Sequence, residues 1–173
     1  MNIYGNIGDS NKKIAWRNKL KETNKKCIVI IGWIVFYIYI LLLSYFLFFS
    51  ERYGRDLITD NYNLQPFREI KRFIKYREQV GLEGFLVNIV GNVLAFSPLG
   101  FFLPLLNKNY RKFYKIAIIS ILFSLIIEAS QLLLKVGVFD VDDILLNSLG
   151  GILGYLCFLI FHSIYKKIYG QTF

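Results

Sequence analysis

Residues 85–106 read FLVNIVGNVLAFSPLGFFLPLL, an apolar run that contains two asparagines, Asn88 and Asn92. About 20 predominantly apolar residues are enough for a helix to cross a bilayer. An amide side chain in hydrocarbon is costly, and it persists mainly where it faces a partner or a water-filled cavity. The run therefore predicts a membrane helix with one polar face.

Three further apolar runs have a similar length. Their approximate bounds are Cys27–Phe49, Tyr114–Leu134 and Ile144–Tyr165. Composition is less decisive than these runs, because a hydrophobic content of 55% exceeds the average of soluble domains, roughly 45–50%, only modestly. The four runs predict an all-α, polytopic membrane protein with four transmembrane helices. No repeat, glycine–serine linker or low-complexity tract divides the sequence.

Lysine and arginine indicate the orientation of these helices. They outnumber acidic residues before the first run, between the second and third, and after the last. Because such residues are enriched on the cytoplasmic side, both termini are expected in the cytoplasm. The expected organisation is a basic cytoplasmic leader (1–26), a membrane domain in the cell membrane (27–165) and a short cytoplasmic tail (166–173).

The formal net charge of +9 follows from the same distribution. Proteins that bind nucleic acid present a clustered basic face with aromatic platforms or a reading motif. Here the basic residues are spread over segments that flank helices, so no nucleic acid partner is expected. The expected partner is the lipid bilayer, including anionic head groups of the cytoplasmic leaflet beside the leader.

An amphipathic helix is predicted in the first outer loop. After Pro66, the stretch Phe67–Lys75 has apolar residues at positions i, i+3, i+6 and i+7. Proline is tolerated in the first turn of a helix, where its missing N–H has no partner in any case. A basic polar face suits a helix that lies flat among lipid head groups. Either this helix only covers the bundle, or Arg68, Arg72 and the neighbouring lysines bind the phosphate of a lipid head group.

Polar residues recur at one end of three predicted membrane helices. They are Asn88 and Asn92 in the second, Glu128 and Gln131 in the third, and Asp140, Asp142, Asp143 and Asn147 at the start of the last. Spacings of three or four residues put the members of a pair on one helix face. Asp140 and Asp142 are expected in the loop that precedes the last helix. The three helices together predict one outward-facing polar site just beneath the membrane surface.

Each of these residues also has a structural interpretation. The asparagine pair could join helices, with about 1 kcal/mol for each interhelical hydrogen bond. Asp142 and Asp143 could cap the helix that they precede. Glu128 points more strongly to function, since a carboxylate within a membrane helix marks a functional site by default.

Glycines of the last run predict how it packs. Gly150, Gly151 and Gly154 give this helix a face of small residues. Such a face lets the backbones of two membrane helices approach closely. The last helix is therefore expected to contact a neighbour at short distance.

The same residues form an ordered series of motifs. They are Asn63-Leu64-Gln65-Pro66-Phe67, Asn88-x3-Asn92-x3-Phe96-x-Pro98-Leu99-Gly100, Glu128-x2-Gln131 and Phe139-Asp140-x-Asp142-Asp143-x3-Asn147-x2-Gly150. In order and spacing the series resembles the VanZ-like family of bacterial membrane proteins over about residues 60–160. The family takes its name from an accessory protein that raises resistance to the glycopeptide teicoplanin. The resemblance implies a role in the cell envelope and in antibiotic resistance, without naming a reaction.

One position departs from the family pattern. Many members have an arginine three residues before the first aspartate of the last motif, where this chain has Gly137. Lys135 is the nearby basic residue that could substitute for it.

Two functional hypotheses follow, and the enzyme question stays open between them. The first is a protein that binds or modifies a lipid or glycopolymer of the cell envelope. Its substrate-binding residues would be Asn88, Asn92, Gln131, Asp140, Asn147, Arg68 and Arg72. The second is an enzyme in which Glu128 acts as general acid or base and Asp143 supplies a second carboxylate.

Two further expectations concern metals and interactions. Asp140, Asp142 and Asp143 carry hard oxygen ligands that could hold Mg²⁺ or Ca²⁺, and no motif for an organic cofactor occurs. The alternative to both hypotheses is a non-catalytic interaction or scaffold protein, in which the polar cluster only locks the helix bundle.

Overall fold

The computed structural model describes residues 4–49, 62–76, 81 and 84–169. In chain order the elements are α1 (Tyr4–Phe49), β1 (Tyr62–Asn63), α2 (Arg68–Lys75), η2 (Leu86–Val90), α4 (Gly91–Leu106), η3 (Lys108–Tyr110), α5 (Phe113–Leu133), β2 (Phe139–Asp140) and α6 (Val141–Tyr169). Parts of the predicted leader, first outer loop and tail lie outside the described residues, namely 1–3, 50–61, 77–80, 82–83 and 170–173.

Four described helices are long and apolar enough to cross a membrane. They are Lys26–Phe49, Leu86–Leu106, Phe113–Leu133 and Val141–Ile168. The prediction of an all-α membrane protein with four spans is therefore confirmed. The last helix begins at Val141 rather than near Ile144, so Asp142, which was expected in the preceding loop, lies in the first turn of α6.

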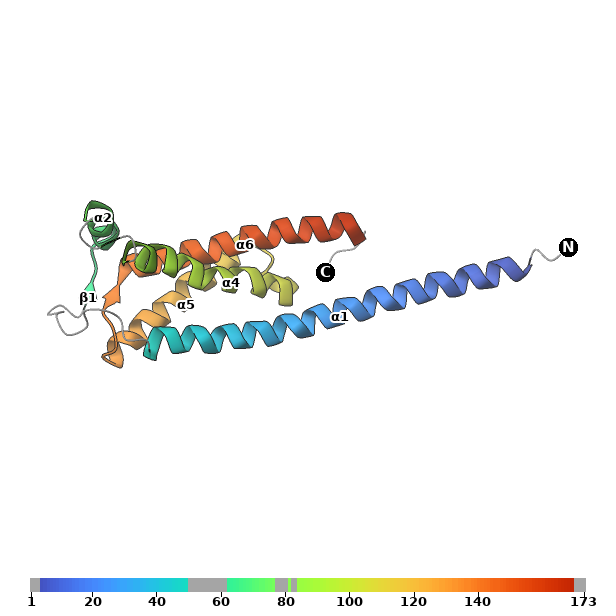
Figure 1. Cartoon of the computed structure of the whole chain (residues 1–173), viewed down its shortest axis with the longest axis horizontal. Coiled ribbons are helices and arrows are strands. Elements are labelled where there is room, and N and C mark those ends of the chain that lie inside the picture. The colour runs from blue at the N-terminus through green and yellow to red at the C-terminus, as the bar shows by residue number, and fades with distance from the viewer. Residues whose placement is uncertain (1–3, 50–61, 77–80, 82–83, 170–173) are drawn as a thin grey trace.

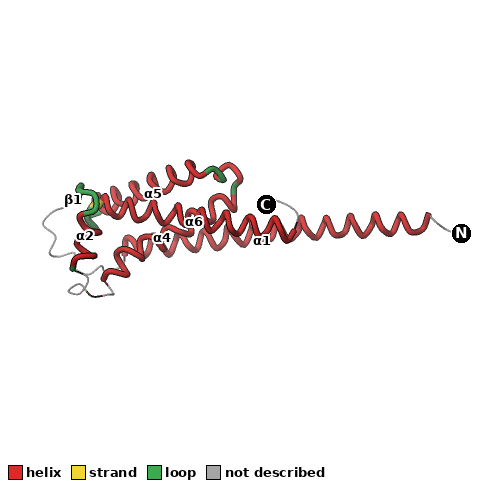
Figure 2. Tube along the Cα trace, turned by 90° about the horizontal axis from the view of Figure 1, so that it is seen from above, coloured by secondary structure: helices red, strands yellow, loops and turns green. Residues whose placement is uncertain are grey.

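The helices form an elongated bundle in which α4, α5 and α6 run alternately up and down (Figures 1 and 2). Helix α1 lies along the outside of this bundle, and its N-terminal part extends well beyond the other helices. Only 11% of its most apolar window is buried, against 33–39% for the other three spans. Both termini lie toward one end of the molecule, while β1, α2 and the starts of α4 and α6 lie at the opposite end.

Helices α4 and α6 pack closely because glycines lie where their backbones meet. A Cβ atom on Gly154 would collide with the carbonyl oxygen of Ser97. Gly100 of α4 meets the backbone of Gly151 in the same way, and Gly150 also packs against the α4 backbone. The small-residue face predicted for the last helix is therefore confirmed.

The apolar core has two parts along the bundle. One cluster contains Leu43, Leu47, Phe96, Leu99 and Ile127, and it begins one helical turn below Asn92. The other contains Leu105, Ile116, Tyr155 and Phe158, nearer the end where the termini lie. The first cluster closes the bundle beneath the polar residues of α4, α5 and α6.

Replacing Gly154 by alanine is expected to destabilise the bundle. The new Cβ would meet the backbone of Ser97, and overpacking of this kind typically costs about 1–3 kcal/mol or more. Gly91→Ala is the matched control, because its Cβ would lie 3.7 Å from the nearest atom, the Leu86 carbonyl oxygen. Membrane abundance and thermal unfolding in detergent measure the effect. Equal stability of the two variants would contradict the close packing of α4 and α6.

Candidate functional site

At one end of the bundle α1 and α5 finish and α4 and α6 begin (Figure 1). The segments that meet there carry many polar residues. The buried ones at this end include Asn63, Asn92, Glu128, Gln131, Asp142 and Asn147. Three more, Asn88, Asp140 and Asp143, are half-buried. The structure thus brings together the polar residues of three helices that sequence periodicity placed at one level, and it adds Asn63 of β1.

The carboxylate of Asp142 caps helix α2. Its Oδ1 accepts the backbone N–H of Phe67, and its Oδ2 accepts those of Glu69 and Ile70 at 2.8 and 3.2 Å. The first amides of a helix have no partner within the helix, and a negative charge there also interacts favourably with the helix dipole. Asp142 therefore caps a helix some seventy residues earlier in the chain, and not the helix that it begins.

A two-residue parallel ladder joins the same two regions. Tyr62 pairs with Phe139, and Asn63 pairs with Asp140. The side chain of Asn63 donates a hydrogen bond to Asp140 Oδ1 at 3.1 Å, and the same oxygen accepts the Asp142 N–H at 2.8 Å. Asp140 thereby caps α6. Sequence analysis did not name Asn63 as a site residue, although the first motif of the series begins with it.

Burial raises the pKa of Asp140, while the hydrogen bonds from the Asp142 amide and the Asn63 side chain, and the charge of Arg72, oppose this shift. Burial likewise raises the pKa of Glu69, against the charge of Arg72. The two carboxyl groups and one guanidinium therefore share one electrostatic environment at the edge of the polar cluster.

Glu128 lies beneath this edge. It is 2% exposed, and its Oε2 accepts the backbone N–H of Asp140 at 3.1 Å. A buried carboxylate requires hydrogen-bond partners to offset its lost hydration. Its observed contact supports β2 from below, so a molecule at the surface would meet the half-buried Asp140 before Glu128.

Asn92 and Asp143 connect α4 to α6. The Asn92 side chain donates a hydrogen bond to Asp143 Oδ1. Asn88 behaves differently, because its amide donates to the Gly84 carbonyl oxygen of its own chain segment at 2.8 Å. Asn88 also lies within η2, a π-helical turn, and such turns are frequent at functional sites. Asn92 therefore joins two helices, whereas Asn88, the other member of the predicted pair, makes a local contact.

Gln131 and Asn147 make buried contacts between helices. Gln131 Nε2 donates to the Leu47 carbonyl oxygen at 2.9 Å, which fastens α5 to the end of α1. Asn147 Nδ2 donates to Ser124 Oγ at 2.9 Å, which fastens α6 to α5. Both side chains are almost inaccessible, at 3% and 2% exposure. Their observed role is to hold the helices together.

Helix α2 presents cations beside the cluster. Arg68 and Arg72 are exposed, and Arg72 forms an ion pair with Glu69 at 2.7 Å. Phe67 and Ile74 are also exposed, at 53% and 55%. Exposed basic and apolar side chains on one short helix suit a membrane surface, and the interfacial position of α2 stays a prediction.

The start of α2 differs from the predicted one. Pro66 lies in the turn before the helix and not in its first turn. The connecting residue Phe67 has φ 63°, in the left-handed region, which an aromatic residue rarely adopts. This conformation directs the Phe67 N–H to Asp142.

The three aspartates do not converge as metal ligands. Among the described residues, no three His, Cys, Asp or Glu side chains are grouped so that they could hold a metal ion. The physical reason lies in the partners of Asp142, since both of its oxygens already accept amides of α2. A Mg²⁺ or Ca²⁺ site at Asp140, Asp142 and Asp143 stays a prediction.

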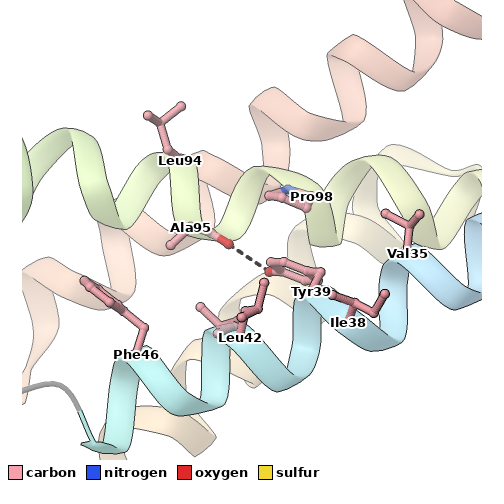
Figure 3. A pocket seen from close by; sticks show the side chains of 9 residues that line it. Val35, Ile38, Tyr39, Leu42, Phe46, Leu94, Ala95 and Pro98 are labelled. Atoms are coloured by element: carbon pink, nitrogen blue, oxygen red, sulfur yellow. Dashed lines mark hydrogen bonds between the residues drawn. The ribbon is translucent and has the colours of Figure 1, made fainter.

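An apolar groove of about 390 Å³ lies between α1 and α4, away from the polar cluster. Figure 3 shows Tyr39 of α1 pointing across it toward Ala95 of α4. The Tyr39 hydroxyl donates to the Ala95 carbonyl oxygen at 2.8 Å. This bond fastens the peripheral helix α1 to the bundle at mid-span.

Four membrane-length helices with a polar cluster at one end define a multi-pass helical membrane protein. The chain belongs to the VanZ/LLP1 family, whose model matches residues 36–162. The resemblance drawn from the motif series is therefore confirmed, and the match also takes in the C-terminal part of α1, from residue 36. No curated protein and no solved structure matches the chain.

Asp142→Asn is expected to loosen α2, because it removes the negative charge and one accepting oxygen from the cap. Hydrogen bonds to charged groups contribute about 1.5–3 kcal/mol, so exchange of the α2 amides should accelerate about tenfold or more. Hydrogen–deuterium exchange of peptides that cover residues 62–76 measures this.

Asp143→Asn is the matched control, since Asp143 bonds Asn92 and the same change is made one residue further along. Unchanged exchange of α2 in Asp142→Asn would contradict the cap. An equal acceleration in both variants would mean that the effect is general and not due to the cap.

Proposed function

We propose that this protein binds a phosphate-bearing lipid or glycopolymer precursor of the bacterial cell envelope at its polar end, and thereby influences susceptibility to glycopeptides such as teicoplanin. The observation that carries the proposal is the Asp142 cap, which holds the basic helix α2 beside half-buried carboxylates and amides. The polar end faces outward in this proposal, in keeping with the distribution of lysine and arginine.

Phosphate recognition is assigned to the arginines of α2. Arg72 is exposed, and its charge acts on both Glu69 and Asp140. A guanidinium presents a planar fork of donors that matches phosphate oxygens. Arg68, one turn earlier on the same helix, supports the same anion. Exposed Phe67 and Ile74 would enter the boundary between head groups and acyl chains.

Recognition of hydroxyl groups is assigned to the accessible polar residues. Asn88, Asp140 and Asp143 are half-buried and carry amide or carboxylate groups that can bond sugar or glycerol hydroxyls. If a bond in the ligand is made or broken, Asp143 is, like Asp140, a half-buried carboxylate that the ligand would reach. Glu128 would then act through the Asp140 amide as a positioning residue.

The scaffold alternative has its own support. The contacts of Gln131 with Leu47 and of Asn147 with Ser124 are buried and join different helices. Interhelical hydrogen bonds of this kind stabilise a bundle whether or not a ligand is bound. In this alternative, loss of function in any polar variant would follow loss of the folded protein.

Arg72→Gln tests the proposal in a strain that lacks the native protein. Because Arg72 is exposed, the variant is expected to accumulate normally yet lose most of the protection against teicoplanin. Lys71→Gln is the matched control, since it removes the same charge from the residue beside Arg72. Positions two apart on a helix do not face each other, so Lys71 points away from Glu69.

Membrane abundance and teicoplanin susceptibility are read side by side. Equal susceptibility of the two variants would contradict a role for the Arg72 guanidinium. If wild type confers no protection, the link to glycopeptides is wrong for this chain.

Asp143→Asn distinguishes binding from scaffold. Asparagine keeps an oxygen that can accept from Asn92, so the variant should be as abundant as wild type. Lost protection at normal abundance would support a ligand at the polar end. Gln131→Ala supplies the opposite case, because it removes the bond to Leu47 and should lower abundance and protection together. Protection that tracks abundance in both variants would favour the scaffold.

A further inference from the structure

A second group of interacting side chains lies toward the other end of the bundle, where the loop between α4 and α5 passes beside α6 (Figure 1). On α6 it comprises Tyr155, Phe158, His162 and Lys166. Spacings of three, four and four residues put these four on one stripe of the helix. Arg111 of the loop contacts this stripe. None of these residues belongs to the polar end described above.

Arg111 is held in place by three contacts. Its Nε donates to the Pro104 carbonyl oxygen at 3.1 Å, and its guanidinium carbon lies 5.6 Å from the centroid of the Phe158 ring. Its own carbonyl oxygen accepts the Tyr155 hydroxyl at 2.6 Å. Burial lowers the pKa of Arg111, although a guanidinium remains charged in proteins. A cation fixed in this way differs from the mobile lysines and arginines that only mark the cytoplasmic side of a membrane.

His162 lies on the same aromatic ring. Its ring stacks with Phe158 at a centroid distance of 5.5 Å. Its Nδ1 is buried and has no hydrogen-bond partner within the part of the chain that the structure describes. The charges of Arg111 and Lys166 both act on the imidazole. Three nitrogen-bearing side chains therefore share one small region.

Acidic residues are missing from the segments that form this region. The sequence has no aspartate or glutamate between Glu83 and Glu128, and none after Asp143. The same segments carry Lys108, Arg111, Lys112, Lys115, Lys166 and Lys167. The charge of this end is therefore positive, and an anion is the complementary partner.

We propose that Arg111, His162 and Lys166 bind the phosphate group of an anionic membrane lipid at the membrane face opposite the polar end. Basic pockets beside transmembrane helices bind lipid head groups, and an arginine fork with a lysine ammonium suits a phosphate. A lipid is favoured over free phosphate because Phe113, whose ring packs against Tyr155 of the stripe, and Leu159, three residues before His162, are exposed, at 53% and 41%. Apolar side chains of this kind offer a surface to an acyl chain.

Native mass spectrometry of the purified full-length protein tests the site, with an equimolar mixture of phosphatidylglycerol and phosphatidylcholine as probe. Phosphatidylglycerol is expected to be retained preferentially. Lys166→Gln should weaken its binding about fivefold, the effect of roughly one basic residue near an anionic head group. Lys167→Gln is the matched control, because adjacent helix positions do not face the same partner. The readout is the difference in lipid binding between the variants, because the cations of α2 can also bind phosphatidylglycerol in every variant.

Arg111→Gln should weaken binding about tenfold, because it removes a charged donor fork. Arg111→Gln also loses the ring contact with Phe158, which can affect folding. If this variant does not fold, the comparison of Lys166→Gln with Lys167→Gln tests the proposal, because Lys166 is exposed. Equal retention of the two lipids by wild type would overturn the proposal. Equal effects of Lys166→Gln and Lys167→Gln would overturn it as well.

Inorganic phosphate separates the two sources of the anion. If millimolar phosphate leaves the bound phosphatidylglycerol in place, the lipid assignment is supported. If it displaces the lipid from wild type and from Lys167→Gln alike, the site takes free phosphate, which overturns the assignment to a lipid.

Discussion

The carboxylate of Asp142 satisfies three backbone amides of α2 while being 1% exposed. A buried charge is tolerated only where such donors replace water. Here the donors come from a segment far away in sequence, so folding of the short helix α2 is coupled to the start of α6. The Asn63–Asp140 contact and the ion pair of Arg72 with Glu69 lie on either side of this cap. The cap therefore helps to hold the cations of α2 beside the carboxylates.

The glycines between α4 and α6 set the distance between these two helices, and the polar end depends on that distance. A Cβ atom at Gly154 or Gly100 would meet backbone atoms of the facing helix, so α4 and α6 pack backbone against backbone at these glycines. That separation lets the short side chains of Asn92 and Asp143 reach each other directly. Wider packing would leave room for water or require longer side chains. The apolar middle of the bundle and its polar end are therefore parts of one arrangement.

Sequence predicted the spans and the level of the polar residues well, because length, hydropathy and helical spacing are local properties. It could not separate Asp142 from Asp143, which are adjacent carboxylates with the same local context. Their roles are set by distant partners, Phe67 in one case and Asn92 in the other. The ladder of β1 and β2 is two residues long, too short for an alternating pattern. The three aspartates have different partners for the same reason, and among the described residues no three acidic, His or Cys side chains are grouped as metal ligands.

The polar end has two layers with different properties. Gln131, Asn147 and Glu128 are at most 3% exposed, and their contacts join helices or support β2. Asp140 and Asp143 are half-buried above them, with Arg72 exposed at the edge. A buried amide that joins helices is worth about 1 kcal/mol in a membrane, and it cannot contact a ligand without breaking that bond. The scaffold and ligand-binding interpretations therefore need not compete for the same residues. The lower layer fixes the geometry, and the rim above it is where the proposed ligand would bind.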